Sequence, residues 1–445
     1  MSSGSVFEQL LGFVSEAASG IPDLRIGHTD YSMRDVGLAA FSVFYSQCPS
    51  FLAHQQAMQS GRGFNNARTL FGIESIPSDN WIRTLLDPVV PRTFYGAFDR
   101  CLDLMKEKGI LEGMRTRQGH LLAGLDGTEF FRSEAIHCPH CTRTTHGKDR
   151  IEYSHMAVTP AIMKPASEVV FPLVCEFVRQ QPGLEPQDCE LVAGQRWIAA
   201  HGARYRALGL TLLGDDKYAN HPTCTEILQA GFHFILNCKP SSHKELYTSL
   251  EVERKSGAVE ELNRRVWTGK VHLLYHYRFC NALPIRDSED ALQVNWMELL
   301  ITCEETGEQE YHNSFITDFL ISRENVEDLV EEGRCRWKIE NEHNNTLKTK
   351  GYHFEHNFGH GEDHLSEILL LLNLLAFLFH NILERLDQYY HRVRQKLSAR
   401  ETFFDGVREL TRYLCFASWD SLLRFMLRAL EDGPGPPPDP NSIIR

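Results

Sequence analysis

Short apolar runs that end in acidic residues recur along the chain and predict buried β-strands. The first run, LLAGLDGTEFF at residues 121–131, leads into Asp126. The second run, LGLTLLGDDKY at residues 208–218, leads in the same way into Asp215 and Asp216. Open α/β sheets place their functional residues beyond the carboxyl ends of such strands. We therefore expect these acids to lie at a functional edge of a sheet.

The spacing of apolar positions divides the remainder of the chain into helical and strand-rich regions. Residues 1–119 have helical spacing and predict a helical domain, and residues 386–445 predict a helical region that ends in a flexible Pro/Gly tail. Residues 120–239 and 314–385 alternate strand and helix patterns, which predicts two parts of one α/β domain. Between them, short strand-like runs at residues 240–313 predict a mostly-β insertion, after which residues 315–322 predict a strand that returns to the main sheet.

Composition is that of a soluble globular protein. The chain has 445 residues, of which 42% are hydrophobic, enough for two or three domains with sizeable cores. Its most apolar run, residues 368–379, contains Asn373 and is shorter than the roughly 20 residues that span a membrane, so it predicts a buried core helix. The start of the chain does not resemble a secretory signal. We therefore expect a cytoplasmic protein that does not insert into a membrane.

Charge leaves the class of partner open. The formal net charge of −13 gives no support to a nucleic-acid partner, because dedicated DNA-binding domains usually carry net positive charge. A basic face can nevertheless coexist with acidic helices elsewhere in the same protein. The charge therefore does not exclude DNA.

Cysteine and histidine residues gather in the segment 137–155 and predict a metal site. Cys138 and Cys141 form a pair with two residues between them, and His146 and His155 follow. Two thiolates and two imidazoles complete a four-coordinate zinc site, which would be structural because protein ligands fill every position. Two further histidines are competing ligands, His137 and His140. The alternative is a reduced cysteine pair with incidental histidines, but the density of ligands favours zinc.

From Asn325 onward the chain has helical spacing, and this predicted helix carries a third acidic stretch, RWKIENEHNNTLK at residues 336–348. Arg336 and Glu340 are four residues apart and share one helix face, with Lys348 two turns beyond. On its own this is also the pattern of a solvated helix with paired charges. If Glu340 meets Asp126 and Asp215, the three carboxylates require divalent cations, and oxygen ligands favour Mg²⁺ or Mn²⁺. Two such ions about 4 Å apart support phosphodiester chemistry.

The order of these motifs resembles that of bacterial insertion-sequence transposases of the DDE type. In that family a ribonuclease-H-like catalytic domain is interrupted by a strand-rich insertion before the final acid. Asp126 followed by a glycine and a threonine matches the first acid, and Asp215, three residues before Tyr218, matches the second better than Asp216 does. Arg336 and Glu340 match the arginine and glutamate of the helical signature, and Glu342 is an alternative to Glu340.

The helical signature is incomplete at two positions. Gly333 stands where the family has a tyrosine, and Leu347 stands where it has a lysine, with Lys348 next to it. These differences concern the part of the signature that contacts the substrate. They keep a catalytically inactive, zinc-stabilised DNA-binding protein among the alternatives, beside a metal-dependent DNA nuclease without strand transfer.

The resemblance implies a fold, a reaction and partners. The fold is of the α/β class, with a ribonuclease-H-like mixed sheet, flanking helices, the mostly-β insertion and an N-terminal helical domain. Asp126, Asp215 and Glu340 would hold two Mg²⁺ or Mn²⁺ ions, while Arg336, Lys348 and Tyr218 would contact DNA. The N-terminal helices would recognise terminal inverted repeats in double-stranded DNA, and a homodimer would hold the paired ends during cleavage and strand transfer into target DNA.

Overall fold

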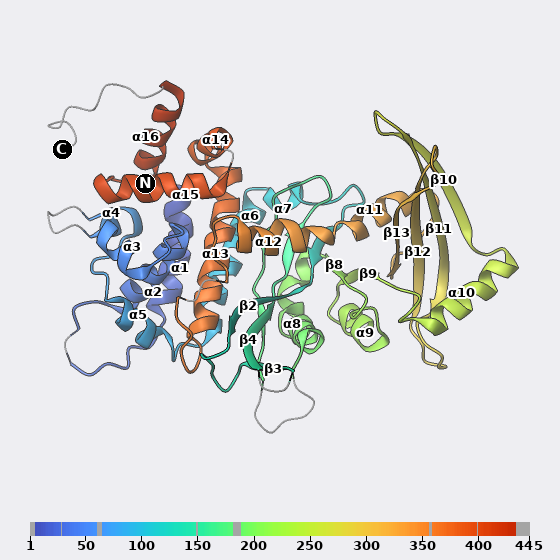
Figure 1. The fold of residues 1–445 in the computed structure, drawn as a ribbon, viewed down its shortest axis with the longest axis horizontal. Coiled ribbons are helices and arrows are strands. Elements are labelled where there is room, and N and C mark those ends of the chain that lie inside the picture. The colour runs from blue at the N-terminus through green and yellow to red at the C-terminus, as the bar shows by residue number, and fades with distance from the viewer. Residues whose placement is uncertain are drawn as a thin grey trace.

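A helical layer, a central sheet and a long extension of that sheet lie side by side in the structure (Figure 1). The structure is a computed structural model that describes residues 5–27, 29–59, 65–147, 150–180, 188–355, 358–397 and 399–432. The predicted Pro/Gly tail at residues 433–440 lies outside the described residues. Helices and a mixed sheet together place the chain in the α/β class, as the sequence predicted.

The N-terminal layer is helical, as its periodicity predicted. Its helices are α1 (Val6–Ser19), α2 (Met33–Tyr45), α3 (Phe51–Met58), α4 (Asn66–Phe71), α5 (Asp79–Leu86), α6 (Tyr95–Glu107) and α7 (Ile110–Gly113). Ser5 and Ser32 begin α1 and α2 with capping boxes, which satisfy otherwise unpaired amide groups of the first turn. α1 and α2 pack closely, because a side chain at Gly37 would come within 2.5 Å of the Ala18 Cβ atom.

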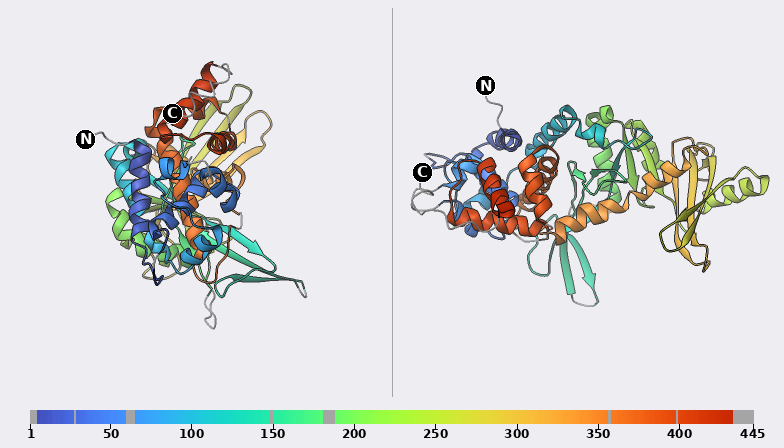
Figure 2. Two further views of the ribbon diagram at one scale, coloured as in Figure 1. Left: turned by 90° about the vertical axis from the view of Figure 1, so that its left-hand side faces the viewer. Right: turned by 90° about the horizontal axis from the view of Figure 1, so that it is seen from above.

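The helix α13 (Leu365–Leu386) lies between the helical layer and the sheet (Figures 1 and 2). By length and composition it could cross a membrane, but 94% of its most apolar window is buried inside the protein. Its polar side chains find partners there: Asn373 donates to the Tyr352 carbonyl at 2.9 Å, and Asn381 donates to the Val170 carbonyl at 2.7 Å. The helix is therefore buried as a core helix, as its composition predicted.

The central part of the main sheet places three parallel strands side by side. β1 (Leu121–Gly124) pairs in parallel with β8 (Leu210–Gly214), which pairs in parallel with β9 (His233–Asn237). On its other side β1 pairs in antiparallel fashion with β5 (Ala161–Met163), and β5 pairs with the short β6 (Phe171–Pro172). The helices α8 (Glu190–Tyr205) and α9 (His221–Gln229) connect these strands, so the predicted apolar runs are buried strands.

The strand-rich insertion continues the same sheet. β13 (Gln309–Thr317) pairs with β9 through residues 315–317, and β12 (Gln293–Cys303), β11 (His272–Pro284) and β10 (Glu260–Trp267) follow in order. The nine strands run β10-β11-β12-β13-β9-β8-β1-β5-β6. Together with α10 (Lys244–Ser256), the insertion strands β10 to β13 form the protruding end of the molecule (Figure 1). The strand expected at residues 315–322 begins earlier, at Gln309, and ends at Thr317.

A second, smaller sheet grows out of the first. β2 (Gly127–Ser133) follows β1 directly, and β4 (Arg150–Val158) leads into β5. The chain therefore passes from the main sheet into the smaller sheet after β1 and returns to the main sheet after β4. β2 pairs with one edge of β4, and β3 (Thr142–His146) and β7 (Glu176–Val178) pair with successive parts of its other edge. The passage lies at Asp126, whose carbonyl accepts a 3.0 Å hydrogen bond from the Thr159 amide.

The helix predicted from Asn325 onward is interrupted. α11 (Val326–Arg334) is followed by a π-helical segment, Ile339–Asn344, and then by α12 (Asn345–Thr349). π-helical turns widen a helix locally and are frequent at functional sites. The segment carries Glu340 and ends close to β1. The chain finishes with α14 (Gln388–Lys396), α15 (Arg400–Tyr413) and α16 (Trp419–Asp432) beside the N-terminal helices.

Candidate active site and candidate metal centre

Asp126 stands at the point where β1 meets the π-helical segment. The strand holds the residue in place because the Leu125 amide donates to the Leu213 carbonyl of β8 at 2.8 Å. The Asn344 side chain donates a 3.0 Å hydrogen bond to Asp126 Oδ2 and accepts one of 3.1 Å from the Thr159 hydroxyl. Asp126 is therefore held from two sides, by strands and by the helical segment that carries Glu340.

Negative charges surround Asp126. Burial raises the pKa of its carboxyl to about 7, and the neighbouring charges of Glu190, Glu340 and Asp215 act in the same direction, against Arg336. Charges shift a pKa in this way when they lie close together in a poorly solvated region. The structure therefore brings the three predicted acids into one electrostatic neighbourhood, and it adds Glu190.

Basic side chains separate these carboxylates from one another. The Lys217 ammonium lies 2.8 Å from Glu190 Oε2 and 3.5 Å from Asp215 Oδ2, and Arg336 pairs with Glu340 at 2.6 Å. Among the described residues, groups of metal-ligating atoms within 4.8 Å of one another occur at Cys138, Cys141, His155 and His360, and at His272, Glu304 and Glu305. Asp126, Asp215 and Glu340 form no such group, so their carboxylates are near neighbours without being in ligand contact.

The two aspartates of the second acidic stretch contact different partners. Asp215 Oδ1 accepts from the Lys217 amide at 2.9 Å and its side chain contributes to the charge around Asp126. Asp216 instead accepts from the Lys239 amide at 2.6 Å and contacts the His243 ring at 3.1 Å. Asp215 is thus the member of the pair whose charge acts on Asp126, while Asp216 has other partners.

The remaining predicted contact residues lie in different settings. Tyr218 is fully buried (0% exposed), and its hydroxyl has no hydrogen-bond partner among the described residues. Lys348 forms an ion pair with Glu355 at 2.7 Å. Glu342, the alternative to Glu340, lines a separate cavity of about 440 Å³ together with Arg394 and Arg400. Glu340 is therefore the glutamate of this segment whose charge acts on Asp126.

Two glycines make the acidic site compact. A Cβ atom at Gly127 would lie 2.6 Å from the Glu190 Cγ atom, and one at Gly194 would lie 2.5 Å from the Tyr218 ring. Glu190 therefore packs directly against the backbone that follows Asp126. Glu190 was not predicted from the sequence, because an acid in the first turn of a helix is a common capping feature.

A buried Cys/His cluster lies where the segment between β2 and β3 meets β4 of the smaller sheet. It consists of Cys138, Cys141, His155 and His360. Cys138 Sγ and Cys141 Sγ are 3.9 Å apart, the two thiols lie 3.5 and 3.4 Å from His155 Nε2, and His360 Nε2 lies 3.4 Å from Cys141 Sγ and 3.0 Å from His155 Nε2. All four side chains are at most 8% exposed.

These distances fit the edges of a tetrahedral zinc site. Bonds of about 2.3 Å to sulfur and 2.0 Å to nitrogen place two sulfurs roughly 3.8 Å apart and a sulfur and a nitrogen roughly 3.5 Å apart. The second ring nitrogen of His360 also has a hydrogen-bond partner, since Nδ1 lies 2.7 Å from the Gly361 carbonyl. A hydrogen bond of this kind fixes a ligand's tautomer and orientation. The four residues could therefore hold a metal ion, as the sequence predicted for three of them.

The prediction of His146 as the fourth ligand was wrong. Antiparallel pairing places His146 opposite Arg150 at the far end of the β3–β4 hairpin, where its ring lies 3.4 Å from Glu152. His360, from the loop before α13, takes the fourth position. The competing candidates also lie outside the cluster: His137 packs on the Tyr153 ring, and His140 contacts the Gln180 carbonyl at 3.3 Å.

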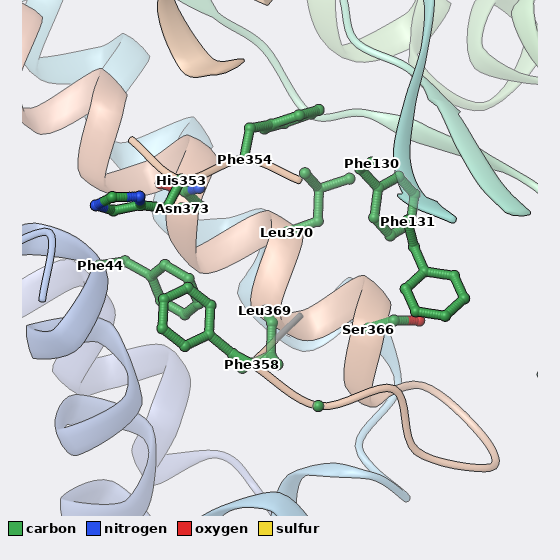
Figure 3. Close-up of a pocket in the computed structure, with 11 residues that line it drawn as sticks. Phe44, Phe130, Phe131, His353, Phe354, Phe358, Ser366, Leu369, Leu370 and Asn373 are labelled. Carbon is green, nitrogen blue, oxygen red and sulfur yellow. The ribbon is translucent and has the colours of Figure 1, made fainter. Parts of the chain in front are cut away.

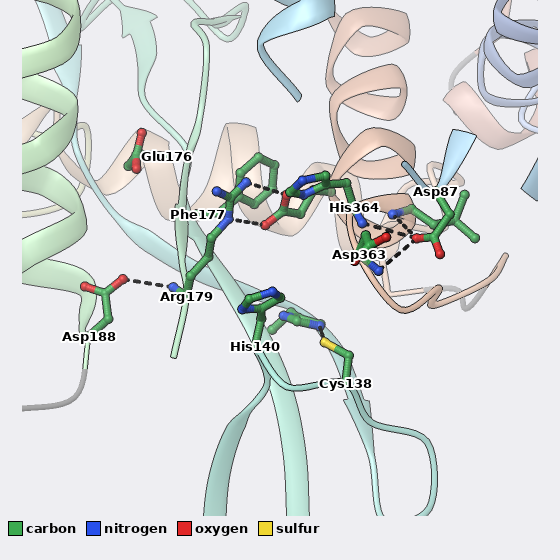
Figure 4. A network of polar contacts seen from close by, with 12 residues as sticks. Asp87, Cys138, His140, Glu176, Phe177, Arg179, Asp188, Asp363 and His364 are labelled. Atoms are coloured by element: carbon green, nitrogen blue, oxygen red, sulfur yellow. Dashed lines mark hydrogen bonds and ion pairs between the residues drawn. The ribbon is translucent and has the colours of Figure 1, made fainter. Parts of the chain in front are cut away.

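The loop that carries His360 is fastened to the helical layer. The carboxylate of Asp87, at the end of α5, accepts hydrogen bonds of 3.0 to 3.2 Å from the amides of residues 362–365 (Figure 4). Burial opposes ionisation of Asp87, but these four bonds outweigh it and lower its pKa. Beside this loop, Arg179 near β7 forms a two-pronged ion pair with Glu367 of α13, both contacts at 2.6 Å. The cluster therefore joins the hairpin, the core helix and the helical layer.

Aromatic side chains shield the cluster on its inner side. A cavity of about 30 Å³ lies between Phe130 and Phe131 of β2 on one side and Phe354 and Phe358 of the segment before α13 on the other (Figure 3). The Phe131 ring centroid lies 4.5 Å from that of His360. An apolar layer of this kind keeps water away from a metal centre and strengthens the interactions inside it.

Comparison with known protein families matches no family model, and comparison with curated proteins finds no similar sequence. The two clusters of side chains therefore carry the functional interpretation. One is a group of carboxylates with paired cations at the carboxyl ends of parallel strands, and the other is a buried set of sulfur and nitrogen ligands.

Proposed function

We propose that this chain is a DDE-type DNA transposase with a ribonuclease-H-like catalytic domain, which cleaves element ends and transfers the freed strand into target DNA. The observation that carries the proposal is the concentration of negative charge around Asp126, which sits between two adjacent parallel strands and the segment of Glu340. Buried carboxylates of this kind are stabilised by divalent cations. Their position at the carboxyl ends of β1 and β8 is where α/β sheets bind ligands.

Asp126, Asp215 and Glu340 would hold two Mg²⁺ or Mn²⁺ ions, since carboxylate oxygens are the ligands that these ions prefer. When bound, the ions would activate the attacking oxygen and stabilise the leaving oxygen of a phosphodiester. Asn344 orients Asp126 through its 3.0 Å hydrogen bond. Arg336 is placed to bind a DNA phosphate once metal neutralises its partner Glu340, and Lys348 and Tyr218 would support the same DNA.

The wider layout would serve the same reaction. The N-terminal helices would recognise terminal inverted repeats, and a homodimer would hold the two ends in the cytoplasm. Cys138, Cys141, His155 and His360 would hold a structural Zn²⁺ ion, because four protein ligands leave no open coordination position for a substrate. Their distance pattern and burial support zinc over an ion that prefers oxygen ligands.

The proposal is tested by Mg²⁺-dependent cleavage and joining of DNA that carries the sequences flanking the coding region. Asp126→Asn should abolish both cleavage and joining while DNA binding persists. Asp216→Asn is the matched control, because Asp216 pairs with Lys239 and His243 instead of facing Asp126. Retention of cleavage by the Asp126 variant would overturn the assignment. Cleavage without any joined product would identify a metal-dependent nuclease that uses the same acids.

A catalytically inactive, zinc-stabilised DNA-binding protein is the second candidate. The ion pairs of Arg336 with Glu340 and of Lys217 with Asp215 favour it, because they already neutralise two of the three acids. This candidate requires that the protein bind DNA with the same affinity with and without Mg²⁺. It is excluded if Mg²⁺ supports cleavage that Asp126→Asn removes.

A further inference from the structure

Glu190 begins α8 and directs its carboxylate toward the other acids. Its side chain is 14% exposed, and its Oε2 atom pairs with the Lys217 ammonium at 2.8 Å. Its Oε1 atom is buried and has no hydrogen-bond partner among the described residues. A buried carboxylate oxygen without a partner is costly, so it indicates a position for a ligand or an ion.

Glu190 also lies in direct contact with the backbone that follows Asp126. The absence of a side chain at Gly127 admits the Glu190 methylene, which would otherwise lie 2.6 Å from a Cβ atom. Glu190 also shares the Lys217 ammonium with Asp215, one of the three predicted acids. By packing and by charge, Glu190 therefore belongs to the same site as the three predicted acids.

A second buried group with an unmet hydrogen bond lies beside Glu190. The Tyr218 side chain is 0% exposed, and its hydroxyl has no partner among the described residues. A Cβ atom at Gly194, four residues after Glu190 in α8, would lie 2.8 Å from this hydroxyl, which places the hydroxyl against the same helix. Buried tyrosine hydroxyls normally find a partner, so an ion with its bound water would satisfy Tyr218.

Lys217 stands between two of the carboxylates. Its ammonium is 2.8 Å from Glu190 Oε2 and 3.5 Å from Asp215 Oδ2, while its side chain as a whole is 58% exposed. A long, exposed lysine side chain can swing into solvent at little cost. The ammonium thus neutralises the pair of carboxylates without being locked into the site.

We propose that Glu190 is a fourth carboxylate of the divalent-metal site, and that Lys217 occupies the cation position between Glu190 and Asp215 until a divalent ion displaces it. This inference rests on the proposed function, because it concerns the same acidic site. A doubly charged ion binds two carboxylates more strongly than an ammonium does, and its arrival would free Lys217 to contact a DNA phosphate. Lys217 would then link metal loading to DNA binding.

The test measures Mn²⁺ binding to the full-length protein without DNA, by titration calorimetry and by the electron paramagnetic resonance signal of free Mn²⁺. Glu190→Gln should weaken binding by about tenfold or more, because one carboxylate charge is lost. Lys217→Met should strengthen it by on the order of threefold to tenfold, because the competing cation is gone. Glu245→Gln, an exposed acid on α10, is the control and should change nothing.

The outcomes separate this inference from the proposed function. If Asp126→Asn abolishes Mn²⁺ binding while Glu190→Gln leaves it unchanged, the role of Glu190 is refuted and the proposed function stands. If Asp126→Asn also leaves binding unchanged, the metal site itself is refuted. Unchanged or weaker binding by Lys217→Met refutes the displacement. Glu190→Asp should restore part of the affinity, and thermal unfolding without metal identifies any variant that loses Mn²⁺ through misfolding.

Discussion

The side chain of Asn344 donates a 3.0 Å hydrogen bond to Asp126 Oδ2, which joins the end of a helical segment to the end of a strand far away in the sequence. Asn344 also accepts from the Thr159 hydroxyl at 3.1 Å, so three separate segments meet at one amide group. This contact positions Asp126 relative to Glu340, four residues before Asn344. It is therefore the contact on which the geometry of the acidic site depends most directly.

Asn344→Ala should lower the rate of Mg²⁺-dependent DNA cleavage by about 10- to 100-fold, the range typical of residues that orient metal ligands. The free energy of unfolding should fall by roughly 1 to 3 kcal/mol, because the hydrogen bonds of Asn344 with Asp126 and Thr159 are both lost and leave buried partners unpaired. Cleavage rates and urea unfolding measure the two effects. Asn341→Ala is the matched control, since Asn341 lies in the same π-helical segment and donates to the Trp337 carbonyl instead. Equal rates for both variants would contradict the positioning role.

The Cys/His cluster should bind about one Zn²⁺ ion per chain, and His360→Ala should lose this ion together with stability, because folding and binding of a structural metal are coupled. Elemental analysis of protein purified without chelator and thermal unfolding measure both properties. Cys138→Ser with Cys141→Ser should have the same effect. His146→Ala should keep its zinc, since His146 lies at the far end of the hairpin. Zinc loss in the His146 variant, or full zinc content in the His360 variant, would refute the ligand set.

Buried His54 should make the protein less stable in acid. Its Nε2 atom lies 2.7 Å from the Ser42 hydroxyl, which itself donates to the Ala39 carbonyl, so Nε2 carries the proton and donates to Ser42. Burial lowers the pKa of His54 from 6.5 to about 3. In the unfolded chain the ring takes up a proton near pH 6.5, so stability is complete above that pH. It then falls by up to about 1.4 kcal/mol per pH unit toward pH 3.

The contribution of His54 is measured as the difference in this slope between the wild-type protein and His54→Gln. Between pH 7 and pH 4, the free energy of unfolding measured with urea should fall less steeply for the variant. The difference in slope should be up to about 1.4 kcal/mol per pH unit, which corresponds to one proton. Other titrating groups contribute equally to both proteins and cancel in the difference. His146→Gln, which changes an exposed ring, should keep the wild-type slope. Equal slopes for His54→Gln and the wild-type protein would contradict the prediction.

Local sequence patterns predicted the elements that carry the acids. The apolar runs before Asp126 and Asp215 are buried strands because each fills both faces of the sheet with side chains. Helical spacing predicted α11 and α13, and the expected core helix is buried as its composition required. These features depend on residues within one element, so a single sequence is sufficient to reveal them.

Features that depend on tertiary contacts were not predictable in this way. Only pairing between β9 and β13 shows that the insertion continues the main sheet. The π-helical segment at Ile339–Asn344 has the same apolar spacing as an ordinary helix over so short a length. Glu190 enters the site because Gly127 leaves room for it, and that fit involves residues far apart in the chain.

The ligands of the Cys/His cluster also impose an order of events during synthesis. His155 and His360 are 205 positions apart, so a ribosome exposes the two cysteines and the first histidine long before the last ligand emerges. Until then the nascent chain would offer only three donors, too few to complete a four-coordinate site. Tight binding of an ion by this cluster would therefore require that the late part of the polypeptide has docked on the early part.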